Sequence, residues 1–415
     1  MNTSKFIGCT MILIGTTIGA GMLALPMVSA AAGFTWSLVF MLIAWIASTL
    51  TGLLIIEVNL ALPIDSCSYS SMAKQTLGNF GKIITWISYL FLLYALITAY
   101  VIGASGFITS IFGSTLHIEI PNWISAILFT FILGSAVFWG TEAVDYLNRI
   151  LMSLKGLMLT AALAFLMPHI EISKLITPQN IHQINYLWLA IPTFVTAFGY
   201  HFVVPSLRMY IGDKPRQLKF IVIIGTTVAF ISYVWWLAAT LSIIPLTGEN
   251  SFTSFAQTPG ASSPAEFTKL LVFIVNNKWV TNSINGFANI ALTTSFLGVA
   301  LGLFDFLAEG FKRQNTRLGR LQTTGLTFIP PLLFAILYPQ GFLKAINYAA
   351  IAFAILTLVL PALMAYYLRK NKTLKSPYRV KCSSTAITLI ILFGAISIVL
   401  AAMYILDLLP NLKNG

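Results

Sequence analysis

A few ionisable side chains lie inside long apolar stretches of this 415-residue chain, and they are the first candidates for chemistry. Lys155, His201 and Glu57 stand among apolar neighbours, where a charge is costly unless it has a partner or a function. Each could take up and release a proton, so we expect proton coupling from this set. Structural roles stay open for His201 and Glu57, and Lys155 could instead reach back to an aqueous surface. For Asp305, near the end of its stretch, we favour a solvated or structural role.

Two apolar segments contain residues that interrupt a helix, which would leave backbone N–H and C=O groups available for binding. The first segment contains the run GTTIGAG at 15–21, followed by Pro26. The segment near 186–211 has Gly199 at its centre and Pro205 beyond it. Glycine and proline make a continuous helix costly, so both helices should break. A half-helix N-terminus attracts a carboxylate and a half-helix C-terminus offers carbonyl groups to an ammonium, so the pair predicts a site for an amino acid.

Eleven apolar segments, each long enough to cross a bilayer, must position these groups. They lie near 6–32, 35–62, 82–112, 122–140, 148–167, 186–211, 218–244, 280–308, 322–338, 342–368 and 384–407. The stretch 245–279 is rich in Ser, Thr, Pro and Gly, which predicts an external loop with a short helix at 264–276. Two interrupted helices separated by five spans indicate an inverted-repeat transporter. The alternative is that Gly and Pro are simply common in membrane helices.

The composition supports a multi-pass membrane protein. The chain is 58% hydrophobic and only 9% charged, which is too little charge for a soluble fold of this size. Of the 24 Lys and Arg, five fall on one side of the predicted spans, and the rest lie on the other side. Those five are Lys174, Lys269, Lys278, Lys344 and Lys413. The bias predicts a cytoplasmic N-terminus and an external C-terminus. The net charge of +12 therefore comes from loops that lie beside the membrane lipid, and it does not indicate a protein that binds nucleic acid.

Other functional classes are disfavoured. Cys9, Cys67 and Cys382 have neither a metal-site spacing nor a disulfide pattern, and we expect no cofactor and no metal. A membrane-embedded enzyme is an alternative, but the chain has no HExxH run and no grouped hydrolase residues. No GxxxxGK[ST] run indicates ATP-driven transport. Broken helices favour an occluding site over the continuous pore of a channel.

Several strings resemble those of the bacterial hydroxy and aromatic amino acid permeases, across about residues 5–407. GTTIGAGMLALP at 15–26 is similar to the first-helix signature of that family, and ALTTSFLGVALGLFD at 291–305 resembles span eight of its tyrosine-specific branch. FGYH at 198–201 fits the sixth helix, although the family carries Phe where this chain has Tyr200. Asn148-Arg149 and Lys155 fall at matching places in span five.

The resemblance implies an all-α, leucine-transporter-like fold with eleven transmembrane helices in one domain. It implies an inverted repeat with halves at about 5–167 and 186–369, broken first and sixth helices, and an extra helix at 384–407. The implied function is proton symport of tyrosine into the cell across the bacterial inner membrane. Sodium coupling, or a broader range of neutral and aromatic substrates, is the alternative.

We therefore predict a substrate site between the two breaks. The carboxylate is expected at Gly19, Ala20 and Gly21, with hydroxyls of Thr16 or Thr17. Asn289 and Thr293 share a helix face with two further asparagines, and this face should point to the cavity unless it only joins helices. With Tyr94 of span three, the expected side-chain pocket comprises Phe198, Gly199, Tyr200, Tyr94, Asn289 and Thr293.

The last prediction concerns coupling. In leucine-transporter-like folds a cation near the first break can tie that helix to span eight, where Thr294 and Ser295 could supply hydroxyls for sodium. We expect the ammonium of Lys155 to occupy this region as a tethered cation. Desolvation disfavours the charged form of a lysine, so loss of its proton would release the helix.

Overall fold

The computed structural model describes residues 3–64, 68–113, 117–139, 141–176, 184–257, 263–311, 316–371 and 374–409, and all regular elements there are helical. Eleven spans are long and apolar enough to cross a membrane when the bent first pair is counted as one, which confirms the predicted fold class. The spans are α1 (Thr3–Thr17) with α2 (Gly21–Ser29), α3 (Gly33–Leu60), α4 (Tyr69–Ile111), α5 (Asn122–Trp139), α6 (Thr141–Leu166), α8 (Ile184–Ala197) with α9 (Val204–Ile211), α10 (Pro215–Ile243), α13 (Lys278–Gly310), α14 (Arg317–Leu337), α15 (Phe342–Phe353) with α16 (Leu360–Lys370), and α17 (Ser384–Ile405).

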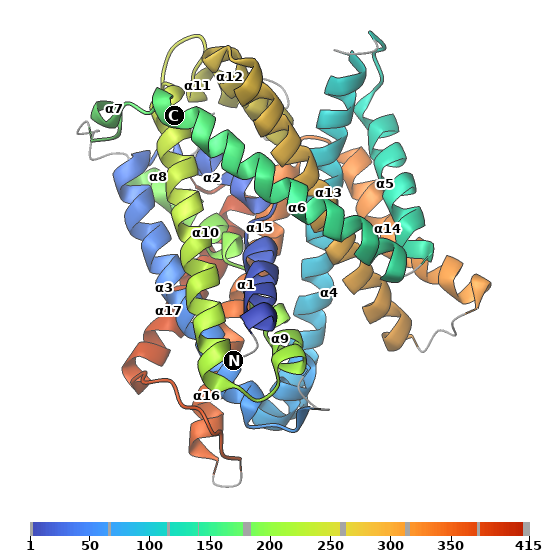
Figure 1. Ribbon diagram of the computed structural model, residues 1–415, viewed down its shortest axis with the longest axis vertical. Helices are drawn as coiled ribbons and strands as arrows, with labels where there is room; N and C mark the ends of the chain where they lie inside the picture. The colour runs from blue at the N-terminus through green and yellow to red at the C-terminus, as the bar shows by residue number, and fades with distance from the viewer. Residues whose placement is uncertain are drawn as a thin grey trace.

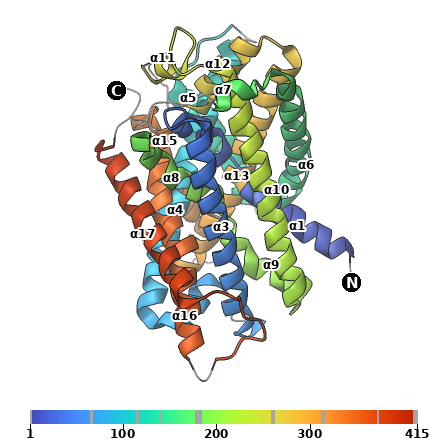
Figure 2. The same ribbon diagram turned by 90° about the vertical axis from the view of Figure 1, so that its left-hand side faces the viewer.

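The two ends of the bundle carry different connections (Figure 1). One end holds the short helices α7 (Ile172–Ile176), α11 (Phe252–Gln257) and α12 (Pro264–Val275). The predicted short helix at 264–276 is confirmed, and it begins where the Ser263 side chain accepts from the Ala265 N–H. The opposite end holds the α9–α10 connection and the end of α16. Figure 2 shows α1 leaning out of the bundle toward the N-terminus.

Both predicted breaks are present. Helices α1 and α2 meet at an angle of 47° across residues 18–20. Span six is interrupted between α8 and α9 by Gly199 and Tyr200 and by a single 3₁₀ turn at His201–Val203. The breaks lie side by side, because a Cβ added to Gly21 would stand 3.9 Å from the Ala197 Cα. A methyl group there would make only ordinary van der Waals contact, so the two backbones lie near one another without a steric need for glycine.

Span ten contains an irregularity that the apolar pattern does not reveal. Residues Ala354–Val359 form a π-helical segment between α15 and α16. Pro361 follows in the first turn of α16, and a proline ring and missing N–H disturb the turn before it. The wider π turn is the local adjustment, and such segments are frequent at functional sites. The Tyr69 hydroxyl of α4 donates to the Leu356 carbonyl inside this segment.

The helices pack around the broken spans. Helix α13 packs along α6 and α4, α15 packs along α4, and α2 lies against α8. Helix α4 begins earlier than the predicted 82–112 span and bends at Gly78, whose φ of 74° suits glycine. Cys9 is buried and free, Cys382 is free, and Cys67 lies outside the described residues.

Candidate functional site: a cavity between two broken helices

A cavity of about 320 Å³ lies at the two breaks. Its backbone-rich wall comes from Gly15–Thr17 and Gly19–Gly21 in span one and from Thr196, Ala197 and Gly199 in span six. The rest of the lining lies on three other helices: Tyr100 to Tyr89 on α4, Lys155 to Asn148 on α6, and Thr294 to Gly302 on α13. Each of these stretches leads from the level of the breaks to the end of the bundle where α4 begins, so the cavity extends toward that end.

Lys155 provides the one acidic or basic side chain among the described residues that line this cavity. It is only 4% exposed, and its Nζ donates to the carbonyl oxygens of Gly15 at 2.9 Å and Ile18 at 3.0 Å. These carbonyls belong to the end of α1, where the helix dipole favours a positive charge. Lys155 therefore ties α6 to the break in span one and does not reach back to a surface.

The predicted carboxylate site keeps its place beside the cavity. Gly19, Ala20 and Gly21 all line it, and Gly21 begins α2. The N–H groups of Met22 and Leu23 donate to the Gly19 and Ala20 carbonyls, whereas those of Gly19–Gly21 have no backbone partner among the described residues. Thr16 and Thr17 also line the cavity, but each hydroxyl donates to its own helix at 2.8 Å, to Ile12 and Leu13 respectively.

The possible cation site lies opposite the break. Thr294 and Ser295 both line the cavity, and a Cβ added to Gly19 would stand 3.0 Å from the Ser295 Oγ. The Thr294 hydroxyl donates to Ala291 within α13. Within the described residues, no group of His, Cys, Asp and Glu side chains is arranged to hold a metal ion.

Three predicted pocket residues of spans three and six lie elsewhere. The Tyr94 hydroxyl donates to Leu326 of α14 at 2.8 Å, outside the cavity. Tyr200 is fully buried and its hydroxyl donates to Ser48 of α3 at 2.9 Å. Phe198 packs edge-on against Tyr233 of α10 with ring centroids 5.3 Å apart. The break turns the side chains of Phe198 and Tyr200 toward neighbouring helices. Span six lines the cavity through Thr196, Ala197, Gly199, Phe202 and Val203.

The polar face of α13 also departs from expectation. Asn289 and Thr293 do not line the cavity, and their side chains donate to Asn285 and Asn289 carbonyls within the helix. The cavity instead meets α13 at Ser295 and Gly298, on another face of the helix. Periodicity showed which residues share a face, but not which face turns inward.

His201 and Glu57 are likewise away from the cavity. The His201 Nε2 lies 2.8 Å from the Thr51 hydroxyl of α3. Glu57 is 2% exposed, and its carboxylate accepts hydrogen bonds from Nε and Nη2 of Arg369, each at 2.8 Å, and from the Val380 N–H. Glu57 therefore joins the end of α3 to α16 and to the connection that follows it.

The predicted pocket does not include the aromatic wall of the cavity, which consists of Tyr89, Tyr100, Phe202 and Phe353. The Phe353 ring covers the second break so closely that a Cβ on Gly199 would stand 2.1 Å from it. Phe353 directly precedes the π segment, whose one sequence signal is the mid-span Pro361. Nothing in the linear pattern connects span ten to the break in span six.

Sequence reasoning also missed Tyr233 of α10. Its hydroxyl lies within hydrogen-bond distance of the carbonyl oxygens of Thr17 and Ala197, at the ends of α1 and α8. Ser48 of α3 donates to the next carbonyl, that of Phe198, at 2.9 Å. The carbonyl ends of both half-helices are thus held by side chains from other spans.

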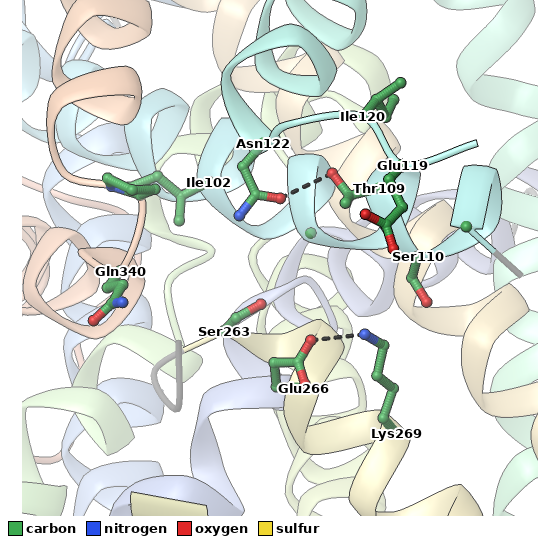
Figure 3. A pocket seen from close by; sticks show the side chains of 13 residues that line it. Ile102, Thr109, Ser110, Glu119, Ile120, Asn122, Ser263, Glu266, Lys269 and Gln340 are labelled. Carbon is green, nitrogen blue, oxygen red and sulfur yellow. Dashed lines mark hydrogen bonds and ion pairs between the residues drawn. The ribbon is translucent and has the colours of Figure 1, made fainter. Parts of the chain in front are cut away.

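A larger cavity of about 680 Å³ lies at the opposite end, between the end of α4 and α12 (Figure 3). Its walls carry the exposed Glu266–Lys269 ion pair and the hydrogen bond from Thr109 to Asn122. None of the predicted site residues lines it. Broken backbone and a buried charge are found only at the smaller of these two cavities, which we take as the candidate site.

Comparison with known proteins identifies the family of this chain. Residues 2–401 match the model of the tryptophan/tyrosine permease family. A tryptophan-specific transport protein of Pseudomonas aeruginosa (strain UCBPP-PA14) is 33% identical, with 99% of this chain and 97% of the relative covered. Tyrosine-specific transport system 1 of Haemophilus influenzae (strain ATCC 51907 / DSM 11121 / KW20 / Rd) is 32% identical, with 95% of each chain covered.

Solved structures support the fold. The manganese transporter of Eremococcus coleocola, in complex with an aromatic bis-isothiourea substituted compound, superposes with a TM-score of 0.61 at 15% identity, covering 97% of this chain and 86% of that one. The likeness at this identity concerns the arrangement of the helices.

Proposed function

The chain belongs to the tryptophan/tyrosine permease family, a group of bacterial multi-pass membrane transporters, and from this premise we propose that it imports tyrosine or tryptophan by symport with a proton. The relatives named for the two amino acids are about equally similar to this chain, so the proposal covers both substrates. The observation that carries the coupling is the Lys155 ammonium on the carbonyls of Gly15 and Ile18.

The substrate backbone fits between the breaks. A carboxylate at Gly19–Gly21 would meet the free N–H groups and the positive dipole end of α2. An ammonium would face the carbonyl end of α8 at Ala197, which also lines the cavity. This arrangement places one charge of a zwitterion at each broken helix.

The substrate ring fits the aromatic wall. Tyr89, Tyr100, Phe202 and Phe353 offer faces and edges for stacking, and two of them carry hydroxyls for a phenol or an indole N–H. Apolar Leu92, Leu93 and Leu96 complete this side of the cavity. The volume of about 320 Å³ lies within the range of small-ligand pockets.

Coupling follows from the Lys155 contacts. While protonated, the ammonium holds the end of α1 through two charge-assisted hydrogen bonds. When the proton leaves toward the open side of the cavity, both carbonyls lose a charged partner and α1 is released. We infer that this tethered cation replaces the sodium ion that we considered beside Thr294 and Ser295, which favours proton coupling.

The orientation and the inverted repeat are parts of the same proposal. If the basic end is cytoplasmic, the cavity extends toward the cytoplasm, and the outward lean of α1 belongs to an inward-facing state. The repeats at about 5–167 and 186–369 would place the two broken helices in corresponding positions, with 384–407 as an extra helix.

The test uses purified protein in proteoliposomes. Wild type should concentrate labelled tyrosine or tryptophan under an inward proton gradient without sodium, and a protonophore should abolish accumulation. Lys155→Gln should lose gradient-driven accumulation, whereas Lys82→Gln, at an exposed position of α4, should retain it. A sodium requirement, or accumulation by the Lys155 variant, would refute the coupling mechanism.

A further inference from the structure

Three oxygen atoms meet where the two broken helices end. The Tyr233 Oη lies 2.6 Å from the Thr17 carbonyl oxygen and 2.9 Å from the Ala197 carbonyl oxygen. Tyr233 is fully buried, and Phe198 packs on its ring. Helix α10 thus places one hydroxyl between the carbonyl ends of α1 and α8.

These three oxygen atoms share a single hydrogen-bond donor, the Tyr233 hydroxyl, for two carbonyl acceptors. A tyrosine hydroxyl has a single hydrogen, so it donates fully to one carbonyl at a time. No other hydrogen bond reaches the Thr17 or Ala197 carbonyl within the part of the chain that the structure describes. A buried acceptor without a donor is costly, and more so in a surrounding of low dielectric.

We propose that Tyr233 is a positioning residue that holds the two carbonyl ends together, and that the amino group of the substrate supplies the donor that the three oxygens lack. This inference rests on the proposed function. Thr17 and Ala197 both line the cavity, so a substrate ammonium can approach the Ala197 carbonyl from the cavity side. The Tyr233 hydroxyl then donates to Thr17 without competition.

The consequence is a link between substrate recognition and the joint of the two breaks. A bound ammonium satisfies the second carbonyl and closes the contact between α1 and α8. A ligand without an amino group leaves the cluster one donor short. The role of Tyr233 therefore depends on the amino group of the ligand and not on its ring or carboxylate.

The experiment measures dissociation constants on the full-length protein in detergent for wild type and Tyr233→Phe. The probes are tyrosine and tryptophan, their deamino analogues 3-(4-hydroxyphenyl)propionate and indole-3-propionate, and the amines tyramine and tryptamine. We expect the variant to bind the amino acids and amines about tenfold more weakly, while deamino acids change less than about twofold. Ratios of constants from one preparation do not depend on its folded fraction, so a poor yield of the variant does not obscure the result.

Tyr94→Phe is the matched control, because its hydroxyl also donates to a carbonyl but lies outside the cavity. Its ratios should equal those of wild type. An equal loss for all ligands in Tyr233→Phe, or no loss for the amines, would overturn the proposal and leave the proposed function intact. Wild type that binds neither aromatic amino acid would overturn both.

Discussion

Lys155 and Glu57 are both buried ions, and their partners separate their roles. Lys155 is held by two carbonyls beside the cavity, where a change of charge alters the hold on α1. Glu57 is held by a guanidinium that also donates to the Val380 and Cys382 carbonyls, far along α3 from the break. Buried ion pairs of this kind are costly to break from one side.

Glu57→Gln is therefore expected to act on stability. Removing its charge leaves the partly buried Arg369 guanidinium without its counter-ion, which should lower the free energy of unfolding by about 3 kcal/mol. Detergent-denaturation curves measure this. The control Glu266→Gln removes a surface ion pair with Lys269 and should cost less than about 1 kcal/mol. A stable Glu57 variant that lost proton-driven accumulation would instead assign Glu57 to coupling.

Gly199→Ala tests the contact between the second break and the aromatic wall. The added methyl group would overlap the Phe353 ring, displacing it and weakening tryptophan binding by about tenfold. Phe353→Leu in the same chain should recover part of the affinity by making room. Gly156→Ala adds the same group where nothing lies within 4 Å and should bind normally. Normal affinity in Gly199→Ala would show that the ring position is unimportant.

At the scale of whole helices, the ends of the broken spans face the cavity, and side chains of other spans hold these ends in place. Lys155 of α6 and Tyr233 of α10 hold the end of α1, and Tyr233 also reaches the end of α8. In span ten, Tyr69 contacts the π segment that follows Phe353. The site is thus made by ends of helices and by side chains that satisfy them.

Gly19→Val tests the first break. The branched side chain would stand against the Ser295 hydroxyl and cover the N–H groups that we propose for the carboxylate. Binding of both aromatic amino acids should be lost, with the protein still inserted and monodisperse. Gly8→Val makes the same change in α1 where a Cβ meets nothing within 4 Å, and it should bind normally. Unchanged affinity in the Gly19 variant would exclude this placement of the carboxylate.

At the scale of the whole molecule, the orientation in the membrane decides whether the cavity extends toward the cytoplasm or toward the outside. In a variant without Cys9, Cys67 and Cys382, we expect an impermeant maleimide added to intact cells to label Glu249→Cys. Lys375→Cys, at the opposite end and also exposed, should react only after the membrane is permeabilised. The reverse pattern would invert the orientation and make the cavity outward-facing.

The sequence by itself determined the number of spans and both breaks, and it marked Lys155 as an ionisable side chain inside an apolar span. These features depend on local physics, since apolar length, glycine, proline and an isolated lysine each act on their own segment. The resemblance to aromatic amino acid permeases was also readable from strings in spans one and eight. Eleven spans and membership of the family follow from such local signals.

Only the tertiary structure decided which side chains line the cavity. Tyr94 and Tyr200 donate to other spans, and Asn289 bonds within its own helix. Phe353 and Tyr233 instead reach the breaks from spans ten and seven. Helical periodicity shows which residues share a face, but the rotation of each helix is set by packing against all its neighbours. Even the polar face of α13, which the sequence marks clearly, does not turn toward the cavity, so that rotation could not be predicted from the sequence.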